Sequence, residues 1–195
     1  MNFRELLGRR RMVRAYEPEP VPREAIERIV RSVRRGPSAG FSQGLRLVVV
    51  TEPERRRRLG EIVGEESWVG NAPVLVVVCV REDDYHDRYT QPDKLEQTGG
   101  EEIEWRVPWW WVDAGKAIML LLLAAVDEGL GAGLFGVVGD RNDDVRDLLG
   151  APEDLEVVGI VTIGHQAPEP NEERRKTRLR EARRPLDDVV RWERW

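Results

Sequence analysis

"VDAGKAIMLLLLAAVDEGLG", residues 112–131, is the most hydrophobic stretch of the chain. Its uninterrupted apolar part, residues 117–126, is shorter than the roughly 20 residues that a membrane-spanning helix needs. The glycines at its end are typical of a helix terminus. We therefore predict a helix that runs through the middle of a protein core, and no membrane segment.

The sequence on both sides of this helix alternates between helical and strand patterns. Residues 72–80, APVLVVVCV, are apolar throughout, which is typical of a strand covered on both faces. Residues 21–36 place Ile26, Ile29 and Val33 on one helical face. These patterns predict an α+β fold in which a sheet of about four strands is flanked by helices. The predicted strands are 45–51, 72–80, 132–138 and 156–165, and the other predicted helices are 21–36, 53–66 and 140–149.

The length of the chain predicts a single domain over residues 1–195. Residues 81–111 are polar and poorly periodic, so we expect an excursion or lid there. Residues 166–195 are charged and largely non-periodic, and such a tail cannot fold alone. We therefore expect the tail to lie along another surface.

Charge and cysteine content exclude several classes of protein. A formal net charge of −5 argues against general nucleic-acid binding, which requires a basic surface. Cys79 is the only cysteine, so no intramolecular disulfide can form. The first residues lack the apolar segment of a signal peptide, and we expect a cytoplasmic location.

Common catalytic motifs are missing from the sequence or misplaced in it. "GAGLFG" (131–136) matches G-x-G-x-x-G, but it follows a helix and leads into a strand, the reverse of a dinucleotide-binding turn. The histidines, His86 and His165, show no metal-ligand spacing with Cys79. We therefore predict no metal site and no catalytic side chain, so an enzyme of this sequence would rely on a cofactor for its chemical step.

Three polar segments could meet around a phosphorylated, planar cofactor. Residues 9–16, RRRMVRAY, offer guanidinium groups for a phosphate. Residues 37–43, PSAGFSQ, offer small side chains and free backbone amides, and residues 133–136 offer a glycine-rich surface for a flat ring. These are the needs of flavin mononucleotide (FMN). A second arginine run, 55–58, lies on a predicted helix whose consecutive residues point in different directions, which favours a solvated surface.

The same segments resemble the motifs of the FMN-dependent nitroreductase family. The family pattern R-R-S-x-R-x-F is represented by RRMVRAY (10–16), and P-S-x-x-x-S-Q-P-W by PSAGFSQGL (37–45). The family's DAGxAxxxLLLAAxxxGLG helix is matched by residues 113–131. GIVTIGH (159–165) and RRPLDDVV (183–190) fit its closing strand and tail. The resemblance covers nearly the whole chain, with the motifs in the family's order.

The resemblance implies a nitroreductase-like fold with a central mixed sheet, in an obligate homodimer with FMN at its interface and the tail extended onto the partner subunit. Arg10 and Arg14 would hold the FMN phosphate together with Arg183, and the loop at 37–43 would touch the flavin of the partner. Residues 134–136 would place backbone amides near flavin O4 and N5. The implied cofactor-binding residues are Arg10, Arg11, Met12, Arg14, Pro37, Ser38, Ala39, Gly40, Gln43, Leu134, Phe135, Gly136 and Arg183.

Aromatic residues are the candidates for substrate contacts. Trp109–Trp111 cannot all share one face of a helix or strand, so at least one ring should point away from the local core. The rings either fill the dimer interface or form an aromatic wall that selects flat substrates by stacking above the flavin. We predict Phe41, Trp109 and Trp110 as substrate-binding residues.

Two positions depart from the family pattern. Met12 stands where the family usually has a serine, and Gly44-Leu45 replaces Pro-Trp. Neither change removes the arginines expected at the phosphate. Both leave the preference for substrate and for reductant open.

By resemblance, we expect an FMN-dependent oxidoreductase that works by a ping-pong cycle. NADH or NADPH would deliver hydride to FMN and leave, and a planar acceptor such as a nitroaromatic or a quinone would then take it. Two alternatives remain at this level. One is an enzyme of the same fold that fragments flavin to make dimethylbenzimidazole, and the other is an FMN-binding module without useful turnover.

Overall fold

A four-stranded sheet forms the centre of the computed structural model, which describes residues 1–137, 139–170 and 172–195. The strand order is β1-β2-β4-β3, and each neighbouring pair is antiparallel. The β-branched and apolar runs identified in the sequence form these strands, which confirms the predicted α+β class. The bounds are β1 Leu45–Val50, β2 Val74–Val80, β3 Gly131–Gly136 and β4 Glu156–Gly164.

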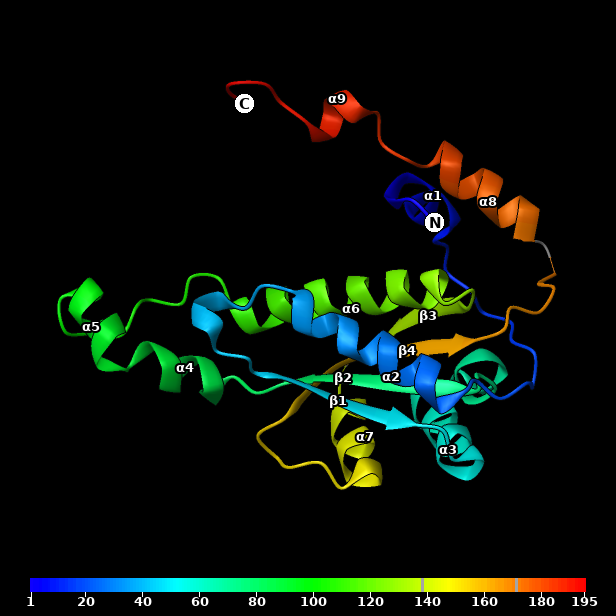
Figure 1. Cartoon of the computed structure of the whole chain (residues 1–195), viewed down its shortest axis with the longest axis horizontal. Coiled ribbons are helices and arrows are strands. Elements are labelled where there is room, and N and C mark those ends of the chain that lie inside the picture. Colours follow the sequence, from blue (N-terminus) through cyan, green and yellow to red (C-terminus); the bar gives the residue numbers. More distant parts are fainter. Residues whose placement is uncertain (138, 171) are drawn as a thin grey trace.

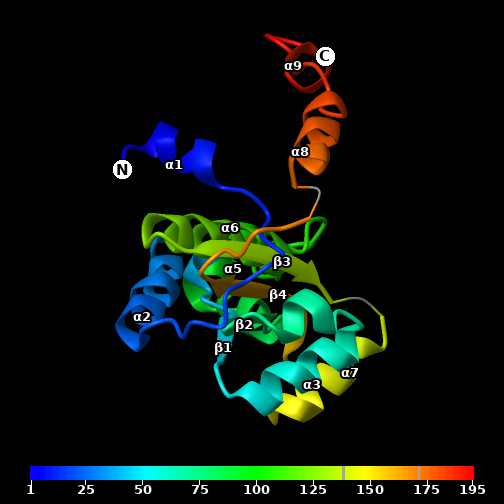
Figure 2. The same ribbon diagram turned by 90° about the vertical axis from the view of Figure 1, so that its right-hand side faces the viewer.

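Helices cover both faces of the sheet, as Figures 1 and 2 show. On one face lie α2 (Arg23–Arg31) and α6 (Trp109–Asp127), and on the other lie α3 (Pro53–Val63) and α7 (Arg141–Leu149). Strand β2 is buried along its whole length, because alternate side chains enter two separate cores. Val76 and Val78 pack beneath α6, whereas Leu75 and Val77 pack towards α3 and α7.

Helix α6 has a buried face and an exposed face. Ala114, Ala117 and Leu121 are buried against the sheet, whereas Val112 and Met119 are exposed. The sequence predicted a helix that runs through the core. Within one chain, only one side of α6 is buried. By length and composition α6 is the one helix in the described ranges that could cross a membrane. Its packing on the sheet is that of a core helix.

The structure contains several short helices that the sequence patterns did not predict. These are α1 (Phe3–Arg9), α4 (Asp83–Tyr89), α5 (Pro92–Thr98), α8 (Glu172–Glu181) and α9 (Leu186–Val189). Apart from Tyr85 in α4 they bury no residue, so they lack the apolar stripe by which a sequence reveals a helix. The predicted helix 21–36 is divided into α2 and a 3₁₀ turn, Ser32–Arg35.

Residues 10–16, which we call the clamp segment, extend along the free edge of β3. Met12 forms a parallel bridge with Ala132, and the Val13 N–H donates a hydrogen bond to the Ala132 carbonyl oxygen at 2.9 Å. Tyr16 forms an antiparallel bridge with Gln166, just beyond β4. The expected mixed sheet is therefore wrong for β1–β4, which pair only antiparallel, and the parallel pairing in the described residues is this isolated bridge.

The C-terminal tail projects away from the sheet. In both views α8 and α9 extend from the body of the chain (Figures 1 and 2). Neither helix has a buried residue, and Trp192 and Trp195 are 84% and 93% exposed. Such exposed tryptophans are typical of a segment that packs on another molecule.

Candidate active site

The clamp segment approaches β3 closely because two glycines face it. A Cβ atom at Gly133 would lie 2.4 Å from the Val13 carbonyl oxygen, and one at Gly131 would lie 2.9 Å from the Val13 side chain. Contacts that short do not occur between real Cβ atoms and backbone, so no larger residue fits at Gly133 without movement. The glycines of the apparent dinucleotide motif therefore serve a close backbone approach.

Tyr16 ties the clamp segment to β4 through its hydroxyl group. The hydroxyl oxygen lies 2.6 Å from Thr162 Oγ1 and 3.0 Å from the Val13 carbonyl oxygen, to which it can donate its proton. Burial raises the pKa of Tyr16 well above its ordinary value, although the hydrogen bond with Thr162 opposes that shift. The phenol therefore stays neutral, and its role is to fix the backbone beside Arg14.

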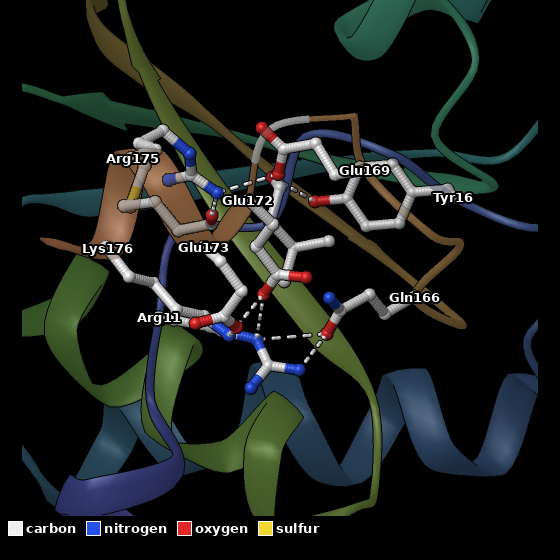
Figure 3. Close-up of polar contacts among 10 residues, drawn as sticks. Arg11, Tyr16, Gln166, Glu169, Glu172, Glu173, Arg175 and Lys176 are labelled. Carbon is white, nitrogen blue, oxygen red and sulfur yellow. Dashed lines mark hydrogen bonds and ion pairs between the residues drawn. The ribbon is translucent and has the colours of Figure 1, made fainter.

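Two arginines of the clamp segment have free guanidinium groups. Within the described part of the chain, the side chains of Arg10 and Arg14 form no hydrogen bond and no ion pair. Arg14 lies over the ring of Trp68, 5.5 Å from its centroid, which is a cation–π contact. Arg11 is occupied, because it donates to Gln166 Oε1 at 2.5 and 3.1 Å and faces Glu172 at 3.4 Å (Figure 3).

Three arginines of the second run, on α3, have partners, and the fourth, Arg55, is exposed. Arg57 forms ion pairs with Glu54 and Glu61, and Arg58 forms one with Glu61. Arg56 donates to backbone carbonyl oxygens. The interpretation of this run as a helix surface agrees with these contacts, and the contrast singles out Arg10 and Arg14 as candidates for binding an anion.

The tail arginine that reaches the clamp segment is Arg175. Its Nη2 atom lies 3.3 Å from the Met12 carbonyl oxygen and 2.6 Å from Glu169 Oε2 (Figure 3). Arg183, the arginine favoured by the family pattern, is exposed and has no side-chain contact with the clamp in the described residues. Sequence reasoning missed Arg175 because α8 is polar all round and gives no periodic signal.

Residues 134–136 leave a backbone surface open at the end of β3. Leu134 packs towards one core and Phe135 towards the other, where its ring contacts Trp68 at a centroid distance of 6.0 Å. Gly136 is exposed, and a Cβ built there would have no atom within 4 Å. A flat ring can therefore approach this backbone.

The predicted loop lines a separate cavity of about 260 Å³. Ala39–Phe41 form a 3₁₀ turn, and the Phe41 ring is 72% exposed. Part of the polar wall of the cavity comes from elements distant in the sequence, and no motif predicted that they meet the loop. Its lining includes Pro37, Ser38, Phe41 and Gln43 from the loop, together with Arg34, Tyr85, Asp113 and Lys116.

Asp113 is a buried carboxylate beneath this loop, with only 7% of its surface exposed. Its Oδ2 atom accepts hydrogen bonds from the Tyr85 hydroxyl at 2.8 Å and from the Ala39 N–H at 3.0 Å. Oδ1 forms an ion pair with Lys116 Nζ at 2.5 Å. The pKa of Tyr85 lies well above its ordinary value, mainly because the residue is buried and, to a smaller extent, because the Asp113 carboxylate is close. Asp113 thus joins the start of α6 to the loop.

The consecutive tryptophans point in different directions, as their spacing predicted. Trp109 and Trp111 are exposed, whereas Trp110 is only 6% exposed. The Trp110 ring packs with Trp105 and Tyr85 at centroid distances of 5.6 and 5.9 Å. Within one chain Trp110 is a core residue, so Trp109 is the member of the predicted pair that a substrate can reach.

The clamp segment and the loop lie at opposite ends of α6 (Figure 1). The chain therefore brings Arg10, Met12 and Arg14 together with residues 131–136, but it does not bring them to residues 37–43. The expectation that the loop serves a partner subunit is compatible with this separation. Among the described residues, no group of His, Cys, Asp and Glu could hold a metal ion.

Comparisons with known proteins extend these observations. A model described as the nitroreductase family matches residues 7–165. The FMN reductase (NAD(P)H) of Bacillus subtilis strain 168 is 30% identical over 80% of this chain, which spans only 63% of the length of that relative. An NADH dehydrogenase of Thermus thermophilus is 28% identical over 94% of this chain and 92% of its own length. The solved structure of a hypothetical oxidoreductase from Bacillus subtilis has a TM-score of 0.76 at 26% identity, with 100% of this chain and 75% of that one covered.

Proposed function

Because this chain belongs to the nitroreductase family, we propose that it is an FMN-dependent oxidoreductase that passes electrons from NAD(P)H to a planar acceptor. Relatives named FMN reductase and NADPH-flavin oxidoreductase support both the cofactor and the electron donor. The structural observation that carries the proposal is the pair of guanidinium groups of Arg10 and Arg14, which form no hydrogen bond and no ion pair among the described residues. Their segment pairs with β3 at Ala132, and β3 ends at the open backbone of Gly136.

The residues of the clamp segment fit the chemistry of FMN. Arg10 and Arg14 would bind the phosphate, since a guanidinium fork matches phosphate oxygens and neither group has a carboxylate partner in the described ranges. The backbone of residues 134–136 would face the flavin edge, where its dipoles stabilise negative charge. FMN, when bound, supplies the hydride chemistry. The protein supplies position and a positive field, and no side chain need act as a base.

The complete site would require two copies of the chain. Phe41 and the cavity at residues 37–43 would then cover the cofactor held by the partner's clamp segment. The exposed apolar face of α6 and the exposed tail supply surface for such a homodimer. Light scattering should give twice the 22.4 kDa of one chain across the micromolar range. A species of 22.4 kDa alone would refute the dimer.

The finer features of the reaction are also part of the proposal. A ping-pong cycle with a nitroaromatic or quinone acceptor fits a site in which both substrates stack on the same flat ring, against Phe41 and Trp109. A cytoplasmic location would give the enzyme access to NAD(P)H. The metal-free chemistry predicted from the sequence requires only the cofactor.

The test is the absorbance spectrum of the purified protein, followed by anaerobic titration with NADH and then with NADPH. We expect a flavin spectrum that either nucleotide bleaches and that 1,4-benzoquinone restores, with turnover of both. Colourless protein that takes up no FMN at micromolar concentration would contradict the proposal. FMN that is reduced but not reoxidised by quinone would point to a storage module, and loss of flavin with formation of dimethylbenzimidazole to the flavin-fragmenting reaction.

A further inference from the structure

The loop at residues 38–43 adopts a backbone conformation that its sequence does not favour. Phe41 has a φ of 60° and Gln43 a φ of 56°, both in the left-handed region that side chains other than glycine rarely adopt. Gly40 shares that region with a φ of 57°. Such a conformation persists only where the surroundings hold it, and its effect here is to expose the large ring of Phe41.

Side chains from three other elements hold this backbone. Asp113 on α6 accepts from the Ala39 N–H at 3.0 Å, and Arg46 on β1 donates to the Gln43 carbonyl oxygen at 2.9 Å. Arg88 on α4 donates from Nε to the Gly40 carbonyl oxygen at 2.9 Å. These contacts fall on either side of Phe41, so the ring is oriented by its neighbours.

Arg88 is the member of this set that connects the loop to the excursion formed by α4 and α5. Its terminal nitrogens donate to Asp93 at 2.7 and 2.9 Å and to Gln91 Oε1 at 3.1 Å. The planar guanidinium can satisfy these acceptors and Gly40 at the same time, which a lysine cannot do. A Cβ atom at Gly40 would lie 2.5 Å from the Tyr89 ring, so α4 packs directly on the loop.

We propose that Arg88 is a positioning residue that sets the place of Phe41 and thereby the affinity for the planar electron acceptor. The inference rests on the proposed function, in which Phe41 faces the cofactor of the partner subunit. The excursion over residues 81–111 then influences the affinity for the acceptor through the side chain of Arg88. Arg88 itself touches neither cofactor nor acceptor, so its effect is confined to the loop.

The experiment uses the full-length, FMN-loaded protein and four variants. Arg88→Ala removes the anchor, Arg88→Lys keeps the charge without the planar fork, and Asp93→Ala removes one support of the guanidinium. Arg106→Ala is the matched control, because Arg106 is exposed and its guanidinium pairs only with Glu104 in the described residues. Amide hydrogen exchange over residues 38–43 is measured together with KM and kcat for 1,4-benzoquinone and the affinity for FMN.

We expect Arg88→Ala to raise the rate of amide exchange in the loop and to raise the KM for benzoquinone about tenfold each. A tenfold change corresponds to the loss of about one charge-assisted hydrogen bond. The FMN affinity and kcat should change by less than about twofold, since the clamp segment is remote. Arg88→Lys should rescue little, Asp93→Ala should give a smaller effect, and Arg106→Ala should match the unaltered protein. This ranking of the variants would identify Arg88 as a positioning residue. A general loss of stability would lower kcat as well, and would not raise KM alone.

Two results would overturn the inference. One is an Arg88→Ala protein whose loop exchange and KM match those of Arg106→Ala. The other is a KM increase in Arg88→Ala without any change in loop exchange, which would place Arg88 in direct contact with the acceptor. Failure of the proposed function is a separate outcome, because the unaltered protein would then not reduce benzoquinone at all.

Discussion

The clamp segment and the loop are both predicted to contact the same cofactor, yet they are held in place by different means. The clamp segment is positioned by backbone pairing with Ala132 and by the space that Gly131 and Gly133 leave open. The loop is positioned by side chains, chiefly Arg88 and Asp113. Its backbone is strained, whereas that of the clamp segment is extended.

This difference suggests a division of labour within the site. A phosphate needs fixed partners, and a segment added to the edge of a sheet moves only with the sheet. Acceptors of different shapes need an adaptable wall, and a loop held by a few side chains can be adjusted without disturbing the core. If the proposed site is right, each chain would carry a rigid half-site at one end of α6 and an adjustable one at the other. The predictions below test this comparison from the largest expected effect to the smallest.

Gly133→Ala should damage the clamp segment most. The added methyl group would meet the Val13 carbonyl oxygen and Thr162, and overpacking against backbone costs about 3 kcal/mol of unfolding free energy. Urea denaturation measures the loss. Gly8→Ala is the control, because Gly8 lies in α1 with open space around it, so its stability should stay the same or rise. Equal stability of the two variants would mean that the clamp segment is not packed as described.

Arg14→Ala should weaken FMN binding without affecting the chemical step. Loss of a charge-assisted contact to phosphate costs about 1.5–3 kcal/mol, or roughly ten- to two-hundredfold in affinity. Turnover should be nearly normal once FMN is saturating. Titration of the FMN-free protein by flavin fluorescence measures the affinity. Arg55→Ala, in the exposed run on α3, should bind FMN normally, and an equal loss there would reverse the distinction between the two arginine runs.

Phe41 allows the strain in the loop to be measured. Phe41→Gly should be more stable than Phe41→Ala by about 1 kcal/mol, because glycine adopts a φ of 60° without the steric cost that alanine pays. Both variants lose the ring, so both should show a raised KM for benzoquinone. Urea denaturation compares the stabilities. If alanine proved as stable as glycine, the loop would not be strained in solution.

The stability of α4, the helix that packs on the loop, should depend on pH, whereas that of the clamp segment should not. Burial would lower the pKa of His86 on α4, but its hydrogen bonds with Glu82 and Glu102 raise the pKa overall. Because the pKa of His86 is higher in the folded state, the protonated imidazole stabilises the fold fully at pH values below its unfolded-state pKa near 6.5. This stabilisation is lost as the pH rises through the folded-state pKa. Amide exchange in α4, corrected for its intrinsic pH dependence, should therefore increase slightly between pH 6 and 8. His86→Gln should abolish that increase, and residues 10–16 should show none in either protein.

Much of the fold could be predicted from the sequence because its main elements carry strong local patterns. The apolar run of β2 and the long hydrophobic stretch of α6 each identify one element without help from the rest of the chain. The start of α6 was misplaced, since Trp109 begins the helix and no capping residue precedes it. The polar helices α4, α5 and α8 gave no signal, because apart from Tyr85 in α4 they bury no residue and so lack an apolar stripe.

The supports of the candidate site were much harder to predict. Residues 10–14 and 37–43 were identified by their motifs, and Asp113 begins the helix motif, but its contact with the loop was not predicted, and neither Arg88 nor Arg175 was identified. Each of these three contacts a backbone group more than 45 positions away, and local spacing carries no information about such pairs. Tyr16 stands at the phenylalanine position of the family pattern, and only the position of Thr162 shows why a hydroxyl group is useful there.

The pairing of the clamp segment with distant partners also affects the order of folding. Met12 finds Ala132 and Tyr16 finds Gln166 only after most of the chain has been synthesised. At about 5–20 residues per second, translation keeps the N-terminal segment waiting for roughly six to thirty seconds. During that time residues 10–16 have no partner strand, and an unpaired extended segment is open to wrong partners. Pairing along the β3 edge is therefore a late event in synthesis, and cofactor binding by Arg10 and Arg14, as proposed, would follow it.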